Sequence, residues 1–118
     1  MATKVLLVSP CRFTNQIQER LQHLGCELLH AENGLRFISR LDVEDPDVII
    51  MDARPAWCDP RVLCRTVKSS HPLKPVFLLA REEAECCGFD GIESAQVFRM
   101  PRQMGQLLRR LRQYARNP

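Results

Sequence analysis

Five short apolar runs, separated by segments of helical character, constrain the fold of this chain more than any other feature. Short aliphatic runs of this kind are typical of strands that are buried on both faces of a parallel sheet. Parallel strands need helical crossovers, and right-handed crossovers place the helices on both faces of the sheet. The predicted strands are Lys4–Val8, Cys26–His30, Asp47–Asp52, Pro75–Ala80 and Gln96–Met100.

The segments between these runs repeat apolar residues at helical spacing, which predicts amphipathic helices. The first covers residues 11–24 and ends at Gly25, and the last carries an apolar stripe from Met104 to Tyr114. The segment 82–93 has two glycines and few apolar anchors, so we expect a short or frayed helix there. In the second and third helices, the side chains predicted on the apolar side are Leu35, Ile38, Leu41, Val62, Leu63, Thr66 and Val67.

This alternation predicts an α/β fold, a doubly wound five-stranded parallel sheet with helices on both faces. The 118 residues suit one domain over residues 1–118, and the 45% apolar and 26% charged content is that of a soluble globular protein. The apolar runs are far shorter than the roughly 20 residues of a membrane helix, so no membrane contact is expected. The N-terminus enters the first strand without signal-peptide anatomy, which predicts a cytoplasmic location.

Charge is distributed in blocks, although the net charge is only +3. From Arg99 onward there are six arginines and no acid, whereas 82–93 holds five acids and no base. Such blocks favour a protein-interaction surface. A nucleic-acid site would require aromatic residues among the cations, and only Tyr114 is available, so we expect no nucleic-acid partner.

The residue that ends the third predicted strand, Asp52, lies at the edge where open α/β sheets place ligand crevices. Asp59 and then Leu63-Cys64-Arg65 follow it, and Met100-Pro101 ends the fifth strand. With five β/α units, this spacing resembles the receiver domain of two-component response regulators, such as the CheY-like proteins, over nearly the whole chain. The resemblance implies the flavodoxin-like strand order 2-1-3-4-5 and a role in signal transduction.

The resemblance also implies a phosphorelay site in which Asp52 is the phospho-acceptor and Mg²⁺ is bound beside it. Receiver domains carry two acidic metal ligands after the first strand, but Ser9 and Pro10 stand at those positions here. Ala80 replaces the hydroxyl residue that contacts the phosphoryl group, and Met100 replaces the lysine that neutralises its charge. Because Mg²⁺ needs hard oxygen ligands and phosphoryl transfer depends on metal and charge placement, these losses predict a degenerate site.

We therefore interpret the chain as a pseudo-receiver, a protein-interaction module that works without phosphorylation, enzymatic activity, cofactor or metal. An alternative is a two-component receiver that still accepts phosphate on Asp52. The purely structural interpretation of Asp52 is a partly exposed strand-end carboxylate paired with a nearby arginine. Arg54, Arg81 and Arg99 are the cations expected to replace part of the lost lysine charge.

Six cysteines suggest a further alternative, because several are predicted on loops at the carboxyl edge of the sheet. Thiolates there could bind a soft metal or form a redox pair, which would make the chain a thiol or metal sensor. The spacing lacks any C-x-x-C pair, so reduced and unconnected thiols are the simpler interpretation. The loop cysteines are Cys11, Cys58, Cys86 and Cys87, and Cys26 and Cys64 are expected in the core.

The partner surface is expected where receiver domains use their fourth helix, fifth strand and fifth helix. Arg109 and Arg112 lie on the last helix, away from its leucine stripe, and form either a solvated face or a protein-binding face. Val97 and Leu108 are the apolar candidates for the centre of a weak homodimer through that face. Trp57, in the loop after Asp52, is either a lid over the site or an interface anchor.

Overall fold

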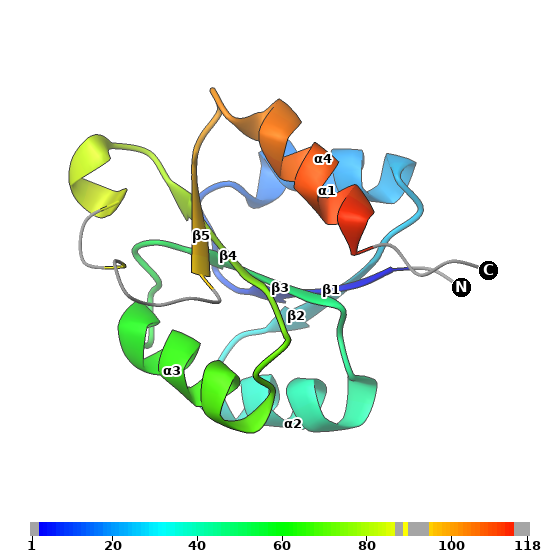
Figure 1. The fold of residues 1–118 in the computed structure, drawn as a ribbon, viewed down its shortest axis with the longest axis vertical. Coiled ribbons are helices and arrows are strands. Elements are labelled where there is room, and N and C mark those ends of the chain that lie inside the picture. Colours follow the sequence, from blue (N-terminus) through cyan, green and yellow to red (C-terminus); the bar gives the residue numbers. More distant parts are fainter. Residues whose placement is uncertain (1–2, 87–88, 90–94, 115–118) are drawn as a thin grey trace.

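A computed structural model describes residues 3–86, 89 and 95–114 of the chain. Five parallel strands form one sheet in the order β2-β1-β3-β4-β5, which confirms the predicted doubly wound topology. Helices α1 and α4 cover one face of this sheet, and α2 and α3 cover the other (Figure 1). The strands are β1 (Lys4–Val8), β2 (Glu27–Ala31), β3 (Val48–Asp52), β4 (Val76–Ala80) and β5 (Ala95–Arg99). The helices of the described residues are α1 (Thr14–His23), α2 (Gly34–Glu44), α3 (Pro60–Ser70) and α4 (Met104–Gln113), with a short 3₁₀ helix, η1 (Glu83–Cys86).

Local sequence signals explain where the helices begin and end. The side chains of Asn33 and Asp59 cap α2 and α3 by accepting hydrogen bonds from the backbone N–H groups of Arg36 and Arg61. Pro60 occupies the first turn of α3, where its missing N–H costs no hydrogen bond. After α1 the backbone turns at Gly25 with φ of 76°, so the predicted stop at this glycine is confirmed.

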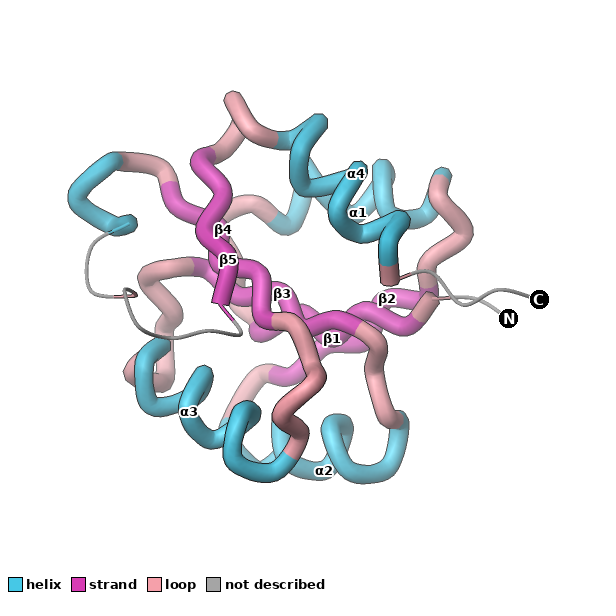
Figure 2. Tube along the Cα trace, in the orientation of Figure 1, coloured by secondary structure: helices cyan, strands magenta, loops and turns pink. Residues whose placement is uncertain are grey.

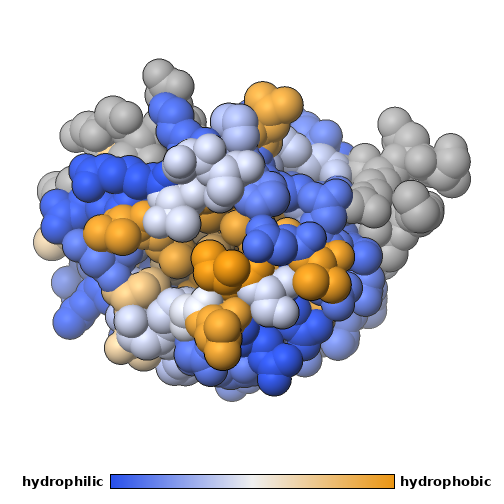
Figure 3. Space-filling view, turned by 90° about the horizontal axis from the view of Figure 1, so that it is seen from below, coloured by the Kyte–Doolittle hydropathy of each residue, from blue (hydrophilic) through white to orange (hydrophobic). Residues whose placement is uncertain are grey.

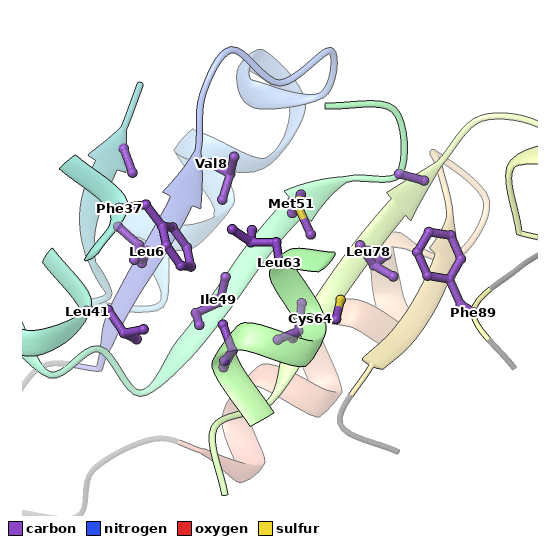
Figure 4. Close-up of a cluster of buried hydrophobic side chains, with 14 of the residues drawn as sticks. Leu6, Val8, Phe37, Leu41, Ile49, Met51, Leu63, Cys64, Leu78 and Phe89 are labelled. Atoms are coloured by element: carbon purple, nitrogen blue, oxygen red, sulfur yellow. The ribbon is translucent and has the colours of Figure 1, made fainter. Parts of the chain in front are cut away.

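The core has two halves because successive strand residues point to opposite faces of the sheet. On the α2–α3 side, Phe37 and Leu41 of α2 and Leu63 and Cys64 of α3 pack onto the strands (Figure 4). Their partners on the sheet include Leu6, Ile49, Met51 and Leu78. On the α1–α4 side, the rings of Phe77 and Phe98 meet edge to face with centroids 5.2 Å apart, and Tyr114 packs on Phe77 at 5.9 Å. The central strands β3 and β4 are buried along their whole length.

The predicted apolar sides of α2 and α3 are partly wrong. Leu35 is 84% exposed, Ile38 44% and Val62 55%, and Thr66 is also exposed. The predictions for Leu41, Leu63 and Val67 are confirmed, and α2 also buries Phe37, which the predicted apolar side did not include. Each helix carries apolar residues on two sides, so spacing alone does not say which side faces the sheet, and the bulky Phe37 fills the core.

Two further predictions need correction or fall outside the described residues. The expected short helix in 82–93 is the 3₁₀ helix η1, and most of the segment beyond it lies outside the described residues. Cys64 is buried as predicted, whereas Cys26 is half-buried.

No helix of the described residues has both the length and the apolar character that crossing a membrane requires.

Candidate functional site

Asp52 lies at the carboxyl end of β3, and its side chain is 1% exposed. The expectation of a partly exposed carboxylate is therefore wrong, because the loops after β1 and β3 close over it. Two backbone N–H groups donate to this carboxylate, from Arg54 at 2.8 Å to Oδ1 and from Arg12 at 3.0 Å to Oδ2. A buried carboxylate needs a counter-charge as well as hydrogen bonds.

Arg12 supplies that counter-charge from the loop between β1 and α1. Its Nη2 donates to Oδ1 of Asp52 at 2.7 Å, and its Nε donates to Oδ2 at 2.9 Å. This is the two-pronged geometry in which a planar guanidinium matches a carboxylate. The guanidinium also lies 5.1 Å from the ring centroid of Phe13. Both oxygens of Asp52 are thus engaged by one internal cation.

The same guanidinium binds a second carboxylate, that of Glu85 in η1. Nη2 lies 2.8 Å from Oε1 and Nη1 lies 3.1 Å from Oε2, and the Arg81 N–H donates to Oε1 at 2.8 Å. Hydrogen bonds from Arg12 lower the pKa of the Glu85 carboxyl from 4.5 to about 2, against the opposing effect of burial. The hydrogen bonds to Asp52 and Glu85 raise the pKa of Arg12 above its ordinary value. We call Asp52, Arg12 and Glu85 the ion triad.

Magnesium does not fit this site. A magnesium ion needs an octahedral set of oxygen ligands, but the acidic ligand positions after β1 hold Ser9 and Pro10. The oxygens of Asp52 that would face the ion already accept hydrogen bonds from Arg12. Among the described residues, no group of three or more His, Cys, Asp or Glu side chains could hold a metal ion. The positive charge of the site is built into the protein.

Trp57 joins the loop after β3 to the loop after β1. Its indole Nε1 donates to the Ser9 carbonyl at 2.8 Å, and its half-buried ring packs against the α2–α3 side of the core. The Ser9 hydroxyl in turn contacts Nδ1 of His30 at 2.9 Å. These contacts connect the two loops through side chains, and the lid and interface-anchor interpretations of Trp57 both stay predictions.

The other degenerate positions contribute no polar group to the triad. Ala80 is fully buried at the end of β4, and Met100 is 4% exposed just after β5. Pro10 is exposed, and the Ser9–Pro10 and Met100–Pro101 peptide bonds are both cis. The Ala80 position therefore offers no hydroxyl, and the Met100 position offers no ammonium group, although a working receiver has both.

The loop cysteines do not form a cluster among the described residues. Cys11, Cys58 and Cys86 are half-buried, and Cys87 lies outside the described residues. Burial raises the pKa of the Cys11 and Cys58 thiols above the ordinary value, and it raises that of Cys64 to about 11. Burial therefore keeps these three thiols in the protonated form. A protonated thiol is a poor metal ligand and a poor nucleophile.

The candidate interaction residues lie apart from the triad. Val97 on β5 and Leu108 on α4 are half-buried and pack against opposite halves of the core. Arg109 and Arg112 are exposed on α4. The acidic segment reaches this side through Glu83 of η1, whose carboxylate lies 3.1 Å from the Arg99 guanidinium. Glu85, another acid of this segment, contacts Arg12 instead, and Asp90 and Glu93 lie outside the described residues.

The sequence prediction missed Arg12 and Glu85. The expected cations were Arg54, Arg81 and Arg99. Among the described contacts, Arg54 brings its guanidinium near the triad, with Nη1 3.8 Å from Glu85, whereas Arg81 gives Glu85 its backbone N–H and the Arg99 guanidinium contacts Glu83 instead. The sequence does contain a signal for Arg12. This arginine lies in the loop where Ser9 and Pro10 replace the two acidic metal ligands of receiver domains, so it brings a positive charge to the place of the metal ion.

Comparisons with known proteins bear on the fold. Neither protein-family models nor curated proteins give a match. Solved structures do match, among them the signal receiver domain of an HD domain-containing protein from Pseudomonas fluorescens, with 22% identity and a TM-score of 0.77 over 97% of this chain and 94% of that one. The chemotaxis response regulator CheY4 of Vibrio cholerae is 20% identical, with a TM-score of 0.73 over 94% of this chain and 99% of that one. A response regulator receiver protein from Sinorhizobium medicae is 18% identical, with a TM-score of 0.76 over 96% and 94% of the two chains.

This chain has the receiver-domain fold. At these identities the likeness establishes the architecture and not the chemistry of the site, because one fold hosts many functions.

Proposed function

We propose that this chain is a receiver-like signalling domain that acts as a protein-interaction module and does not depend on phosphorylation of Asp52. The observation that carries the proposal is the two-pronged contact of Arg12 with the buried Asp52 carboxylate. An aspartate that accepts a phosphoryl group must present a free oxygen to the donor. Here Arg12 holds both oxygens, and Trp57 connects the loop after β3 to the loop after β1.

The energetics support the same conclusion. A phosphoryl group on Asp52 would have to displace Arg12. Breaking a fully buried ion pair costs about 3–5 kcal/mol, and solvent at the 29% exposed Arg12 side chain screens part of that cost. Bound metal and a positioned lysine normally stabilise the transferring group, and the residues at those positions are Ser9, Pro10 and Met100. Phosphorylation of Asp52 would therefore carry the cost of displacing Arg12 without the metal and lysine contacts that normally stabilise the phosphoryl group.

The ion triad gives the domain a fixed state in place of a switch. Arg12 joins the loop after β1 to β3 through Asp52 and to η1 through Glu85. Glu83, in the same short turn as Glu85, contacts Arg99 at the end of β5. Ionic contacts thus lead from Asp52 to β5, the edge strand. The proposed partner surface lies around this strand and includes Val97, Leu108, Arg109 and Arg112.

Treatment with acetyl phosphate and Mg²⁺, followed by intact-mass measurement, tests the proposal. We expect no phosphorylated species, and no Mg²⁺-dependent change in Trp57 fluorescence. The matched variant Arg12→Met frees Asp52 while keeping most of the side-chain volume. A stoichiometric gain of one phosphoryl group in the unmodified chain, lost in Asp52→Ala, would instead establish the phospho-accepting alternative.

A further inference from the structure

The two helical layers of this protein present different surfaces to solvent. The face formed by α2 and α3 carries apolar side chains within a polar surround (Figure 3). The α1–α4 layer presents no large exposed hydrophobic side chain among its described residues, so what it offers to a partner is polar and charged. Every large hydrophobic residue exposed in the described part of the chain belongs to α2, α3 or the loop after α3: Leu35, Ile38, Val43, Val62 and Leu73.

The part of the chain that forms β5 and α4 is basic throughout. Residues 95–114 include five arginines and no acidic residue. Arg99, at the end of β5, contacts Glu83 of η1. On α4, three exposed arginines have no ion-pair partner among the described residues: Arg109, Arg110 and Arg112. This helix therefore carries positive charge that no carboxylate of the described residues pairs with.

A groove lies where α4 packs beside β5, the strand at one edge of the sheet (Figure 2). It has a volume of about 410 Å³, and one residue of β5 and four of α4 line it: Phe98, Gln106, Arg109, Arg110 and Gln113. Because Phe98 is only 6% exposed, the groove meets solvent through the four exposed polar side chains of α4. Arg112 adds to the positive charge of the helix without lining the groove.

The donors of the groove have neutral partners. Nη1 of Arg110 donates to Oε1 of Gln113 at 3.2 Å, and Nε2 of Gln103 donates to Oε1 of Gln106 at 3.1 Å. A glutamine oxygen orients a guanidinium group but does not neutralise it. The two guanidinium groups of the groove, those of Arg109 and Arg110, therefore keep their full charge for an incoming anion.

We infer that this groove binds an acidic segment of another protein. The inference rests on the proposed function, because it names the chemistry of the partner for part of the proposed partner surface. Carboxylates of such a segment would contact Arg109 and Arg110, whose planar guanidinium groups match a carboxylate with two parallel donors. The side-chain amides of Gln106 and Gln113 would donate to carbonyl groups of its backbone.

Other occupants fit the groove less well. A single-stranded nucleic acid needs exposed aromatic side chains on which its bases stack, and the Phe98 ring is buried. A membrane surface needs exposed apolar side chains, which the described residues of α1 and α4 do not present. In a second copy of this chain, Glu83 and Glu85 of η1 are already held in ion pairs, so self-association through this groove would be weak.

Titration of the full chain with a synthetic acidic peptide tests the inference. The probe alternates glutamate and serine, so that its carboxylates lie on one side of an extended chain, and the control peptide has glutamine in place of glutamate. In ¹⁵N–¹H spectra, we expect the glutamate peptide to shift amides of β5 and α4, with an affinity that falls as salt is raised. The glutamine peptide should leave these amides unchanged.

Matched variants locate the binding surface. Arg109→Gln/Arg110→Gln should weaken binding of the glutamate peptide about tenfold or more. Arg20→Gln/Arg65→Gln removes the same charge from exposed arginines of α1 and α3, outside the groove, and should have no effect. Arg109→Lys/Arg110→Lys keeps the charge but loses the paired donors, so its affinity should lie between those of the other two. Thermal unfolding of each variant checks that the fold is retained.

Several outcomes would overturn the inference. These are equal binding of the two peptides, absence of binding at about 1 mM glutamate peptide, and equal loss of binding in the two glutamine double variants. Tighter binding of a single-stranded oligonucleotide than of the glutamate peptide would assign the groove to a nucleic acid instead. Each of these outcomes is distinct from a failure of the proposed function, because phosphorylation of Asp52 is measured on the chain without peptide.

Discussion

Replacing Arg12 by methionine removes the internal cation of the ion triad while leaving an apolar stem of similar length. Asp52, 1% exposed, would keep its two backbone donors and lose its counter-charge. Leaving a buried charge unpaired costs about 3–5 kcal/mol. The Arg12 side chain is 29% exposed, and solvent screens part of that loss. The contact with Glu85, nearer to the surface, adds at most about 1 kcal/mol. We therefore expect Arg12→Met to lower the free energy of unfolding by about 2–4 kcal/mol.

Urea denaturation followed by Trp57 fluorescence and by circular dichroism measures this loss. The double variant Arg12→Met/Asp52→Asn removes both charges but turns the amide NH2 toward one of the two backbone N–H donors, so it should recover only part of the lost stability. Arg20→Met, which removes an exposed arginine on α1, is the matched control and should change stability by less than about 0.5 kcal/mol. A loss below about 1 kcal/mol in Arg12→Met, or a double variant less stable than both single variants, would refute the role given to the triad.

Three further predictions concern pH, thiol chemistry and assembly. Because the pKa of Glu85 is lowered to about 2 from 4.5, its stabilising contribution is present above about pH 4.5 and is lost as pH falls toward 2. In Glu85→Gln, the free energy of unfolding measured with urea should depend less on pH over that range. An unchanged pH dependence would count against the contact between Arg12 and Glu85. Cys64, whose pKa burial raises to about 11, should react with a thiol reagent in the native protein only at the rate of unfolding, as time-resolved thiol counting checks. Self-association through the proposed α4 and β5 face should be weak and decline with salt, and Arg109→Glu/Arg112→Glu should abolish it in sedimentation experiments; a chain that stays monomeric at about 100 μM and low salt, where charges are least screened, would contradict it.

Local sequence patterns were sufficient to predict the architecture. Short apolar runs such as Val48–Asp52 are buried on both faces, so they require a parallel sheet covered by helices, and the structure has that sheet. The position of Asp52 at the carboxyl edge follows from the same topology, because every strand of a parallel sheet ends at one edge. The capping residues Asn33 and Asp59 likewise act through neighbours a few positions away, which sequence displays directly.

Only the tertiary structure decided what surrounds Asp52 and which sides of the helices are covered. The partners of Arg12 lie 40 and 73 positions away, at Asp52 and Glu85, and its place in the loop after β1 does not by itself show that Arg12, and not Arg54 or Arg81, pairs with Asp52. The choice depends on which side chain the closed loops bring within hydrogen-bonding reach of a buried charge. In the same way, Phe37 and not Leu35 faces the sheet because packing volume, and not apolar spacing, settles which side of α2 is buried.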